Sequence, residues 1–133
     1  DNHVIDTDII ADGGYFYRFS KDETTKNIRL DRAKKLLGPY EDVPCPTLDN
    51  LFGVEGPQAY YIESLGKWCL IVDRFATNGG YLPIICDDLA NGDLRILDDS
   101  EFDMGKCKKR HGGVLAITEK EYERLIDAYG VEE

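Results

Sequence analysis

Apolar and polar residues alternate over several short stretches of the chain, a pattern that is typical of half-buried β-strands. The stretch from His3 to Ile10 leads through the turn Asp12-Gly13-Gly14 into the aromatic-rich stretch Tyr15 to Ser20. An Asp-Gly turn between two such stretches indicates a β-hairpin. A charged turn over Lys21 to Lys26 and a further strand over Asn27 to Arg32 follow. The first part of the chain therefore predicts an antiparallel sheet.

The same succession of turn, strand, loop and strand recurs later in the chain. The turn at Gly66 leads into Cys69 to Asp73, and Gly79-Gly80 leads into Tyr81 to Cys86. Placing Gly13 on Gly66 gives an offset of 53 residues between the two copies. Antiparallel units repeated at this spacing favour the blades of a β-propeller, because one such sheet cannot cover both of its faces. Two visible copies leave other β-rich arrangements open.

The remaining pattern predicts short elements and one secure helix. Ala33 to Leu37 is expected to form a helical turn before Gly38-Pro39, and Leu94 to Leu97 and Gly113 to Ile117 are expected to be short strands. A C-terminal helix is predicted over residues 118–130, where Thr118 and Glu121 form a capping box and the chain reaches Gly130. Its apolar stripe is expected to pack on the rest of the molecule; the stripe consists of Tyr122, Leu125, Ile126 and Tyr129. The predicted fold class is all-β with this C-terminal helix, and residues 1–133 read as one domain or as a partial propeller.

Length and charge narrow the classes of ligand. A chain of 133 residues, 42% of them hydrophobic, can bury a core. Its formal charge of -10 disfavours nucleic acid and anionic membranes as partners, and a neutral ligand such as a carbohydrate fits better. No apolar run approaches the roughly 18 residues of a membrane-spanning helix. The first residues, Asp1-Asn2-His3, do not begin a signal peptide.

The four cysteines do not predict a metal knuckle or a disulfide scaffold, because they are too widely spaced and too few. Cys69 and Cys86 lie in apolar stretches, where a free thiol behaves as a small hydrophobic group. Cys107 lies in the basic loop Lys106 to Arg110 and is expected to be exposed.

Three residues are candidates for chemistry, and each has an ordinary alternative. Glu55 lies in the turn Gly53-Val54-Glu55-Gly56-Pro57, where it can project from the open end of a sheet or be a simple loop acid. Asp6 lies between apolar residues, where an ionised carboxylate is costly, but it can also cap a backbone N–H group. His111 precedes a predicted strand, and a lone histidine is more often structural than a ligand.

Other chemistries lack their motifs in this sequence. No glycine-rich phosphate loop, nucleophile elbow or zinc-binding pair of histidines is present. Carboxylate chemistry remains, and a pair of carboxyl groups that protonate a leaving group and activate water is what glycoside hydrolysis requires.

The chain resembles the C-terminal part of the family 43 glycoside hydrolases, five-bladed propellers that cleave arabinofuranosyl or xylosyl linkages with inversion. The matching stretches span nearly the whole chain: Ile5-Asp6 with Asp12-Gly13-Gly14-Tyr15-Phe16-Tyr17, Glu55-Gly56-Pro57 with Lys67-Trp68-Cys69-Leu70, Gly80-Tyr81-Leu82-Pro83, and Arg110-His111-Gly112.

The resemblance implies a role for each candidate. It implies that Glu55 is the general acid and that Asp6 orients it and tunes its pKa, since a negative neighbour and partial burial raise the pKa of a glutamate. It implies that His111 holds a metal ion or a water cluster beneath the sugar. The chemistry needs no cofactor, although a structural calcium ion is compatible with the family. Substrate-binding candidates are Arg110, Tyr81 and Trp68. The family also favours a secreted or periplasmic protein.

The sequence departs from the family pattern in one important respect. The family's general base is an aspartate well upstream of the pKa-tuning aspartate, and only five residues precede Asp6. At the observed spacing the chain has room for about two and a half to three blades. The leading interpretation is therefore the acid-bearing portion of an inverting exo-glycosidase, most consistent with an α-L-arabinofuranosidase or β-xylosidase, whose missing blades lie on preceding segments or on a partner chain. It would act on an oligo- or polysaccharide.

Two alternatives stay open at this point. A non-catalytic carbohydrate-binding or assembly module would explain the missing base. The rings of a bound sugar could stack on aromatic side chains of such a module, namely Tyr15, Tyr17, Tyr60, Tyr61, Trp68 and Tyr81. A β-rich domain in which Glu55 is only a turn residue is the other alternative, and a large separation of Glu55 from Asp6 would favour it.

Overall fold

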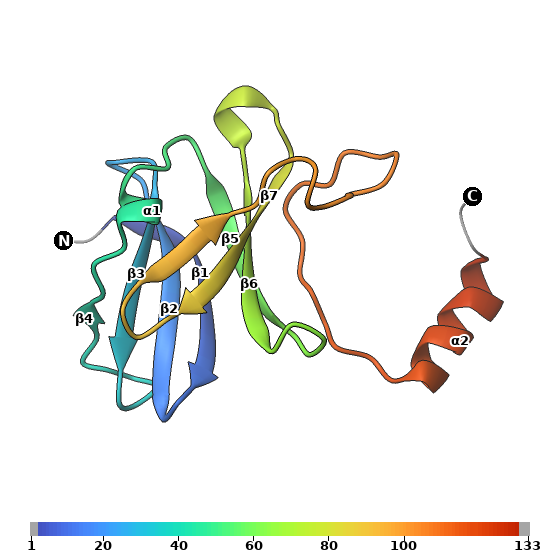
Figure 1. Cartoon of the computed structure of the whole chain (residues 1–133), viewed down its shortest axis with the longest axis horizontal. Helices are drawn as coiled ribbons and strands as arrows, with labels where there is room; N and C mark the ends of the chain where they lie inside the picture. The colour runs from blue at the N-terminus through green and yellow to red at the C-terminus, as the bar shows by residue number, and fades with distance from the viewer. Residues whose placement is uncertain (1–2, 131–133) are drawn as a thin grey trace.

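Two four-stranded antiparallel sheets make up most of the protein in the computed structural model, which describes residues 3–130 (Figure 1). The first sheet contains β1 (Val4–Asp12), β2 (Tyr15–Asp22), β3 (Ile28–Ala33) and β4 (Glu41–Asp42) in sequence order. The second contains β5 (Glu55–Ile62), β6 (Lys67–Asp73), β7 (Tyr81–Asp88) and β8 (Asp93–Ile96), also in sequence order. The predicted all-β class is confirmed, and the two sheets are consistent with two blades of a partial propeller.

The two sheets repeat the same strand register, including an irregularity in the first strand of each. Ile5 pairs with Lys21 and Asp8 with Phe19, so residues 6 and 7 form a bulge in β1. Glu55 pairs with Asp73 and Gln58 with Ile71, so residues 56 and 57 form the equivalent bulge in β5. A bulge bends and twists its strand and redirects the neighbouring side chains. The repeat thus places similar bulges on two strands that lie against each other.

The main core lies between the sheets, where β5 packs against β1 and β2. Phe19 and Leu30 from the first sheet and Leu70 and Ile84 from the second are among its most deeply buried side chains. The short helix α1 (Pro46–Asp49) adds Leu48 to this core and contacts β3 and β8. A smaller core on the other face of the second sheet is covered by the segment that follows β8. The 3-10 helix η1 (Phe75–Thr77) connects β6 and β7.

The predicted helical turn over Ala33 to Leu37 is wrong. Pairing between β2 and β3 continues as far as Ala33, which lies opposite Phe16, so the backbone stays extended there. The following residues form bends and a turn, and Lys34 places its ammonium group 4.0 Å from the centre of the Tyr15 ring. The chain then turns at Gly38, which has a φ of 85°.

The predicted strand over Gly113 to Ile117 is also wrong. This segment has no strand structure and its residues are exposed. In Figure 1 it leads toward α2 (Glu119–Tyr129), and it is not paired with either sheet. A short apolar alternation fits a strand only where a sheet edge is within reach.

The C-terminal helix forms as predicted, but its apolar stripe does not pack. Thr118 and Glu121 form both hydrogen bonds of the capping box, and Gly130 ends the helix. None of the residues of α2 is buried, and Tyr122 and Leu125 are half exposed. Figure 1 shows α2 separated from both sheets by the extended segment before it. The predicted packing against the rest of the molecule is therefore not observed among the described residues.

Cys69, Cys86 and Cys107 follow the expected distribution. Cys45, Cys69 and Cys86 are buried and free, and Cys107 is exposed. Burial raises the pKa of the Cys86 thiol to about 12, with the neighbouring thiols adding to the effect. These buried groups are inert at neutral pH. Within residues 3–130 there is no helix with the length and apolar character that crossing a membrane requires.

Candidate functional site

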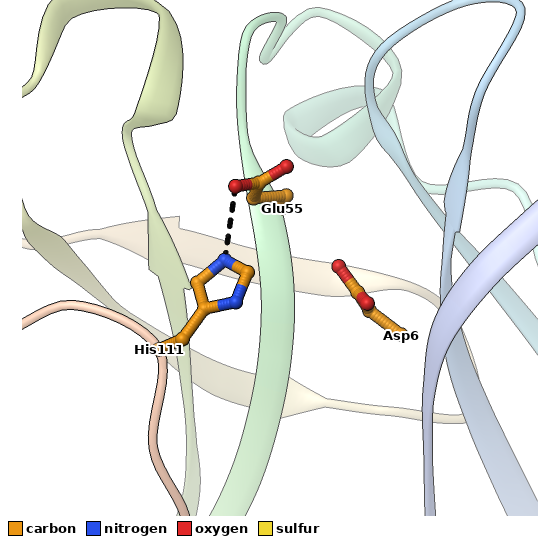
Figure 2. Close-up of side chains that lie close together, drawn as sticks. All are labelled: Asp6, Glu55 and His111. Carbon is orange, nitrogen blue, oxygen red and sulfur yellow. Dashed lines mark ion pairs between the residues drawn. The ribbon is translucent and has the colours of Figure 1, made fainter.

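Three residues that are far apart in the sequence converge at one end of the two sheets. Figure 2 shows Glu55 at the start of β5, Asp6 on β1 and His111 on the loop before α2. Their carboxylate oxygens and imidazole nitrogen all lie within 4.8 Å of one another. All three residues were candidates from the sequence, and the structure brings them together. The alternative that required Glu55 and Asp6 to lie far apart is not supported.

The two bulges create this cluster. Asp6 is the bulge residue of β1 and has a φ of 51°, and its Oδ2 accepts a hydrogen bond of 3.1 Å from the Gly56 N–H group in the bulge of β5. Asp6 therefore does cap a backbone N–H group, and this bond ties the two strands together beside Glu55. The ring of His111 lies against Gly56, where an added Cβ would come within 2.9 Å of the ring. Glycine at position 56 thus permits the close approach of His111.

Lys21 is a member of the site that the sequence analysis missed. Its side chain is only 5% exposed, and its ammonium group lies 2.9 Å from Glu55 Oε2 and 2.8 Å from Glu23 Oε1. It also lies 4.5 Å from the centre of the Phe75 ring. The sequence analysis placed Lys21 in a charged turn, whereas β2 continues to Asp22. The continued alternation of β2 was the signal that could have identified it as an inward-facing residue.

Lys21 and His111 together change the expected protonation of Glu55. Burial raises the pKa of Glu55, but the hydrogen bond and charge of Lys21 and those of His111 outweigh burial, so the pKa lies below its usual value. The expectation that the surroundings raise this pKa is therefore wrong for the free site. Burial alone would lower the pKa of Lys21, but its bonds to Glu23 and Glu55 raise it. Glu55 is consequently an ionised carboxylate at neutral pH.

Asp73 and Arg110 support the histidine from the other side. Asp73 is fully buried at the end of β6, and Arg110 Nε donates hydrogen bonds of 2.9 and 3.3 Å to its two carboxylate oxygens. His111 Nε2 lies 3.0 Å from Glu55 Oε1 and 3.5 Å from Asp73 Oδ2. The Arg110–Asp73 ion pair thus fixes the loop that carries His111. Asp73 was not a candidate in the sequence, because only its pairing opposite Glu55 brings it to the site.

The three predicted substrate-binding residues differ in their position relative to the cluster. Arg110 lies at the cluster and is about half exposed, but its guanidinium group is engaged by Asp73. Tyr81 lies nearby with a buried ring, and its hydroxyl group donates a hydrogen bond of 3.3 Å to the Gly112 carbonyl. It therefore anchors the loop instead of offering a free ring face. Trp68 lies at the opposite end of β6 from Asp73, so the structure does not bring it to this cluster.

The three clustered residues supply few donors for a metal ion. Asp6, Glu55 and His111 offer two carboxylates and one nitrogen, whereas calcium takes six to eight oxygen ligands. Both oxygens of Glu55 are already paired, one with Lys21 and one with His111. A cation there would also meet the positive charge of Lys21. These donors fit a hydrogen-bonded acid cluster better than a calcium site.

Two repeated four-stranded sheets with a carboxylate and histidine cluster at one end define an antiparallel β-domain, consistent with a partial propeller, that carries a carboxylate site. The chain belongs to a glycosyl hydrolase family related to family 43 and described as "Probable glycosyl hydrolase domain", whose model matches residues 1–123. This match confirms the resemblance noted in the sequence and covers all three clustered residues. Comparisons with curated proteins and with solved structures found no match.

Proposed function

We propose that this chain carries the acid side of an inverting, exo-acting glycosidase site, with Glu55 as the general acid. The substrate would be an oligo- or polysaccharide with terminal α-L-arabinofuranosyl residues, or β-xylosyl residues as the next choice. The observation that carries the proposal is the convergence of Asp6, Glu55 and His111 at one sheet end in a chain of a glycosyl hydrolase family. Glu55 would protonate the departing oxygen while water attacks the anomeric carbon.

The neighbours of Glu55 would have separate tasks in this reaction. Asp6 would act as a positioning residue, because its bond to the Gly56 N–H group fixes the backbone next to Glu55. His111 would hold Glu55 Oε1 through its Nε2–H group, 3.0 Å away. Bound sugar would displace water from the cluster, and desolvation favours the protonated form of a carboxyl group. Substrate binding would thereby oppose the effect of Lys21 and supply Glu55 with its proton.

The water-activating base is a separate part of the proposal. We place it on preceding blades or on a partner chain, because the family's base lies upstream of the aspartate that Asp6 matches. The carboxylates of an inverting pair are about 6.5–9.5 Å apart, which leaves room for a water molecule between them.

Replacing Glu55 by glutamine in the complete protein tests the assignment. Hydrolysis of a glycoside with a poor leaving group should fall by roughly 10²–10⁴-fold, because the leaving oxygen needs a proton. An aryl glycoside with a good leaving group should lose much less. Glu63→Gln, in the exposed turn after β5, is a matched control that should leave both rates unchanged. Equal rates of Glu55→Gln and the unmodified protein on the poor leaving group would contradict the proposal.

A non-catalytic carbohydrate-binding or assembly module is the second candidate. It is favoured by the buried Lys21, which pairs with Glu55 and keeps it ionised. An ionised Glu55 could accept hydrogen bonds from sugar hydroxyl groups without transferring a proton. Measuring hydrolysis and binding of the same oligosaccharide separates the candidates: binding without hydrolysis by the complete protein supports the module.

A further inference from the structure

We propose that the pocket at the hairpin end of the sheets is a second carbohydrate-binding site, distinct from the Glu55 cluster. This pocket has a volume of about 390 Å³, within the usual range for small-molecule sites. Its walls combine Tyr15, Tyr61 and Trp68 with Asp12, Asp87 and Asp88. The ligand would be a neutral oligosaccharide; this choice of ligand rests on the proposed function, whereas the pocket itself does not.

The pocket and the Glu55 cluster lie at opposite ends of the same strands. β5 begins with Glu55 and reaches Tyr61 six residues later, and β6 begins near Trp68 and ends at Asp73. At about 3.3 Å per residue, six residues along β5 separate the two places by roughly 20 Å. A single sugar residue cannot contact both. The pocket and the Glu55 cluster therefore bind different sugar residues, and occupation of the pocket does not require contact with Glu55.

The aromatic walls form a preorganised platform. Trp68 Nε1 donates a hydrogen bond of 3.2 Å to Asp12 Oδ1, which fixes the indole from the other sheet. Tyr61 packs edge-on against Trp68 with ring centres 5.4 Å apart. Tyr15 and Trp68 are only partly buried, and both pack against the main core. Rings that are held in place lose little conformational entropy when a ligand covers them.

The polar groups of the pocket can bind hydroxyl groups and disfavour anionic ligands. The carboxylates of Asp12, Asp87 and Asp88 can each accept several hydrogen bonds from hydroxyl groups. They disfavour an anionic sugar. Asp87 is already neutralised by an ion pair with Lys67, and Asn91 donates hydrogen bonds to Asp88. The ring of Tyr15 is covered by the protein's own cation, Lys34. The remaining lone pairs of these carboxylates can accept hydrogen bonds from the hydroxyl groups of a neutral ligand.

Trp68 is the single tryptophan of the chain, so its fluorescence reports occupation of this pocket. We expect arabinohexaose or xylohexaose to change this fluorescence saturably when it is titrated into the full chain carrying Glu55→Gln. Tyr61→Ala should weaken the binding about tenfold or more, because Tyr61 supplies one wall of the pocket. Tyr122→Ala is the matched control, since Tyr122 on α2 is 50% exposed and Tyr61 is 49% exposed. It should leave the binding unchanged.

Further variants and ligands decide between the outcomes. Asp12→Asn keeps the shape of its side chain and removes one charge, so it should still bind the oligosaccharide, but more weakly. The proposal is overturned if neither hexasaccharide gives a saturable change in fluorescence. It is overturned if Tyr61→Ala and Asp12→Asn both bind the hexasaccharide normally, provided that circular dichroism shows Tyr61→Ala to be folded. Tighter binding of spermine or hexagalacturonate would overturn it as well. It is also overturned if the response seen in the unmodified chain is lost in Glu55→Gln.

The same two measurements keep this proposal apart from the proposed function. Loss of hydrolysis in Glu55→Gln without any fluorescence response would remove the second site and leave the acid assignment standing. A fluorescence response together with unchanged hydrolysis in Glu55→Gln would support the second site and contradict the assignment of Glu55 as the acid.

Discussion

Lys21 is the residue that most changes the chemistry expected of Glu55. It is almost fully buried and forms ion pairs with Glu55 and Glu23, so two carboxylates share one ammonium group. A buried charge of this kind persists only when it is well paired. The pair holds Glu55 in its charged form in the free site, which is the reverse of what a proton donor requires. The protonation of Glu55 is therefore the property to measure.

Replacing Lys21 by methionine should raise the pKa of Glu55. The variant removes the hydrogen bond and charge that lower this pKa, whereas burial, which raises it, remains. Nuclear magnetic resonance titration of the glutamate side-chain carboxyl carbons measures the change directly. If Glu55 is the general acid, the fall of kcat/KM with rising pH on a poor leaving group should move to higher pH as well.

Lys26→Met is the matched control for this experiment. Lys26 pairs with Glu23 on the surface, and its side chain is 47% exposed. This variant should leave the titration of Glu55 where it is. A Glu55 that titrates at the same or a lower pH in Lys21→Met would show that Lys21 does not set its charge.

The low pKa of Glu23 predicts that the stability of the protein depends on pH, whether or not the protein is an enzyme. Hydrogen bonds from Lys21 and Lys26 lower its pKa from 4.5 to about 2. Its contribution to the free energy of unfolding is therefore fully present above pH 4.5 and is lost as the pH falls toward about 2. Glu23→Gln should flatten the decline of stability in this window, which urea unfolding at pH 6 and pH 3 can measure. Glu63→Gln should retain the original decline, and an equal flattening there would contradict the assignment.

At the scale of elements, local signals predicted the hairpins and the helix. The turn Asp12-Gly13-Gly14 and the capping box of Thr118 with Glu121 act within a few residues, so the sequence alone reveals them. The repeat of the two sheets could be predicted for the same reason, because each copy carries the same local succession of turns and strands. The helical turn predicted over Ala33 to Leu37 failed because cross-strand pairing, which is a tertiary effect, kept the chain extended at Ala33.

The site was only partly predictable, because the pairing register of the strands determines which residues lie in it. Glu55, Asp6 and His111 were candidates from their local sequence, and the family pattern gave their roles, but their proximity is a tertiary fact. Lys21 and Asp73 carry no local motif. They reach the site only because they pair opposite Ile5 and Glu55, next to the two bulges. No spacing within one strand could have shown these partners.

Gly92, in the turn between β7 and β8, should tolerate alanine less well than Gly14, in the turn between β1 and β2. Gly92 has a φ of 67°, and an added Cβ would overlap the carbonyl oxygen of Pro44 on the segment after β4. Gly14 has a φ of 79° and nothing within 4 Å of its added Cβ. Gly14→Ala should therefore cost only the strain of the left-handed backbone, about 1–2 kcal/mol. Gly92→Ala should cost about 1–3 kcal/mol more, because the backbone must also shift.

Urea unfolding of the two alanine variants checks this difference. Both substitutions add the same methyl group in a positive-φ position, so each serves as the control for the other. Equal free energies of unfolding would mean that the approach of Pro44 to Gly92 does not restrain the turn.

At the scale of the whole molecule, the two sheets and α2 differ in how they are stabilised. The sheets share one core that includes Phe19 and Leu70, whereas α2 buries none of its residues. An isolated helix of fewer than about 12–15 residues is marginal in water. α2 has 11 residues and depends on its capping box. The helix and the sheets should therefore unfold separately.

Thr118→Ala tests this independence, because it removes the side-chain oxygen that accepts a hydrogen bond from the Glu121 N–H group. Losing such a cap costs about 1 kcal/mol of helix stability, so helical circular dichroism at 222 nm should fall. The unfolding of the sheets, followed by the fluorescence of Trp68, should change by less than about 0.5 kcal/mol. Thr118→Ser keeps the oxygen and should preserve the helix. A parallel loss of sheet stability in Thr118→Ala would instead mean that α2 docks on the sheets in solution.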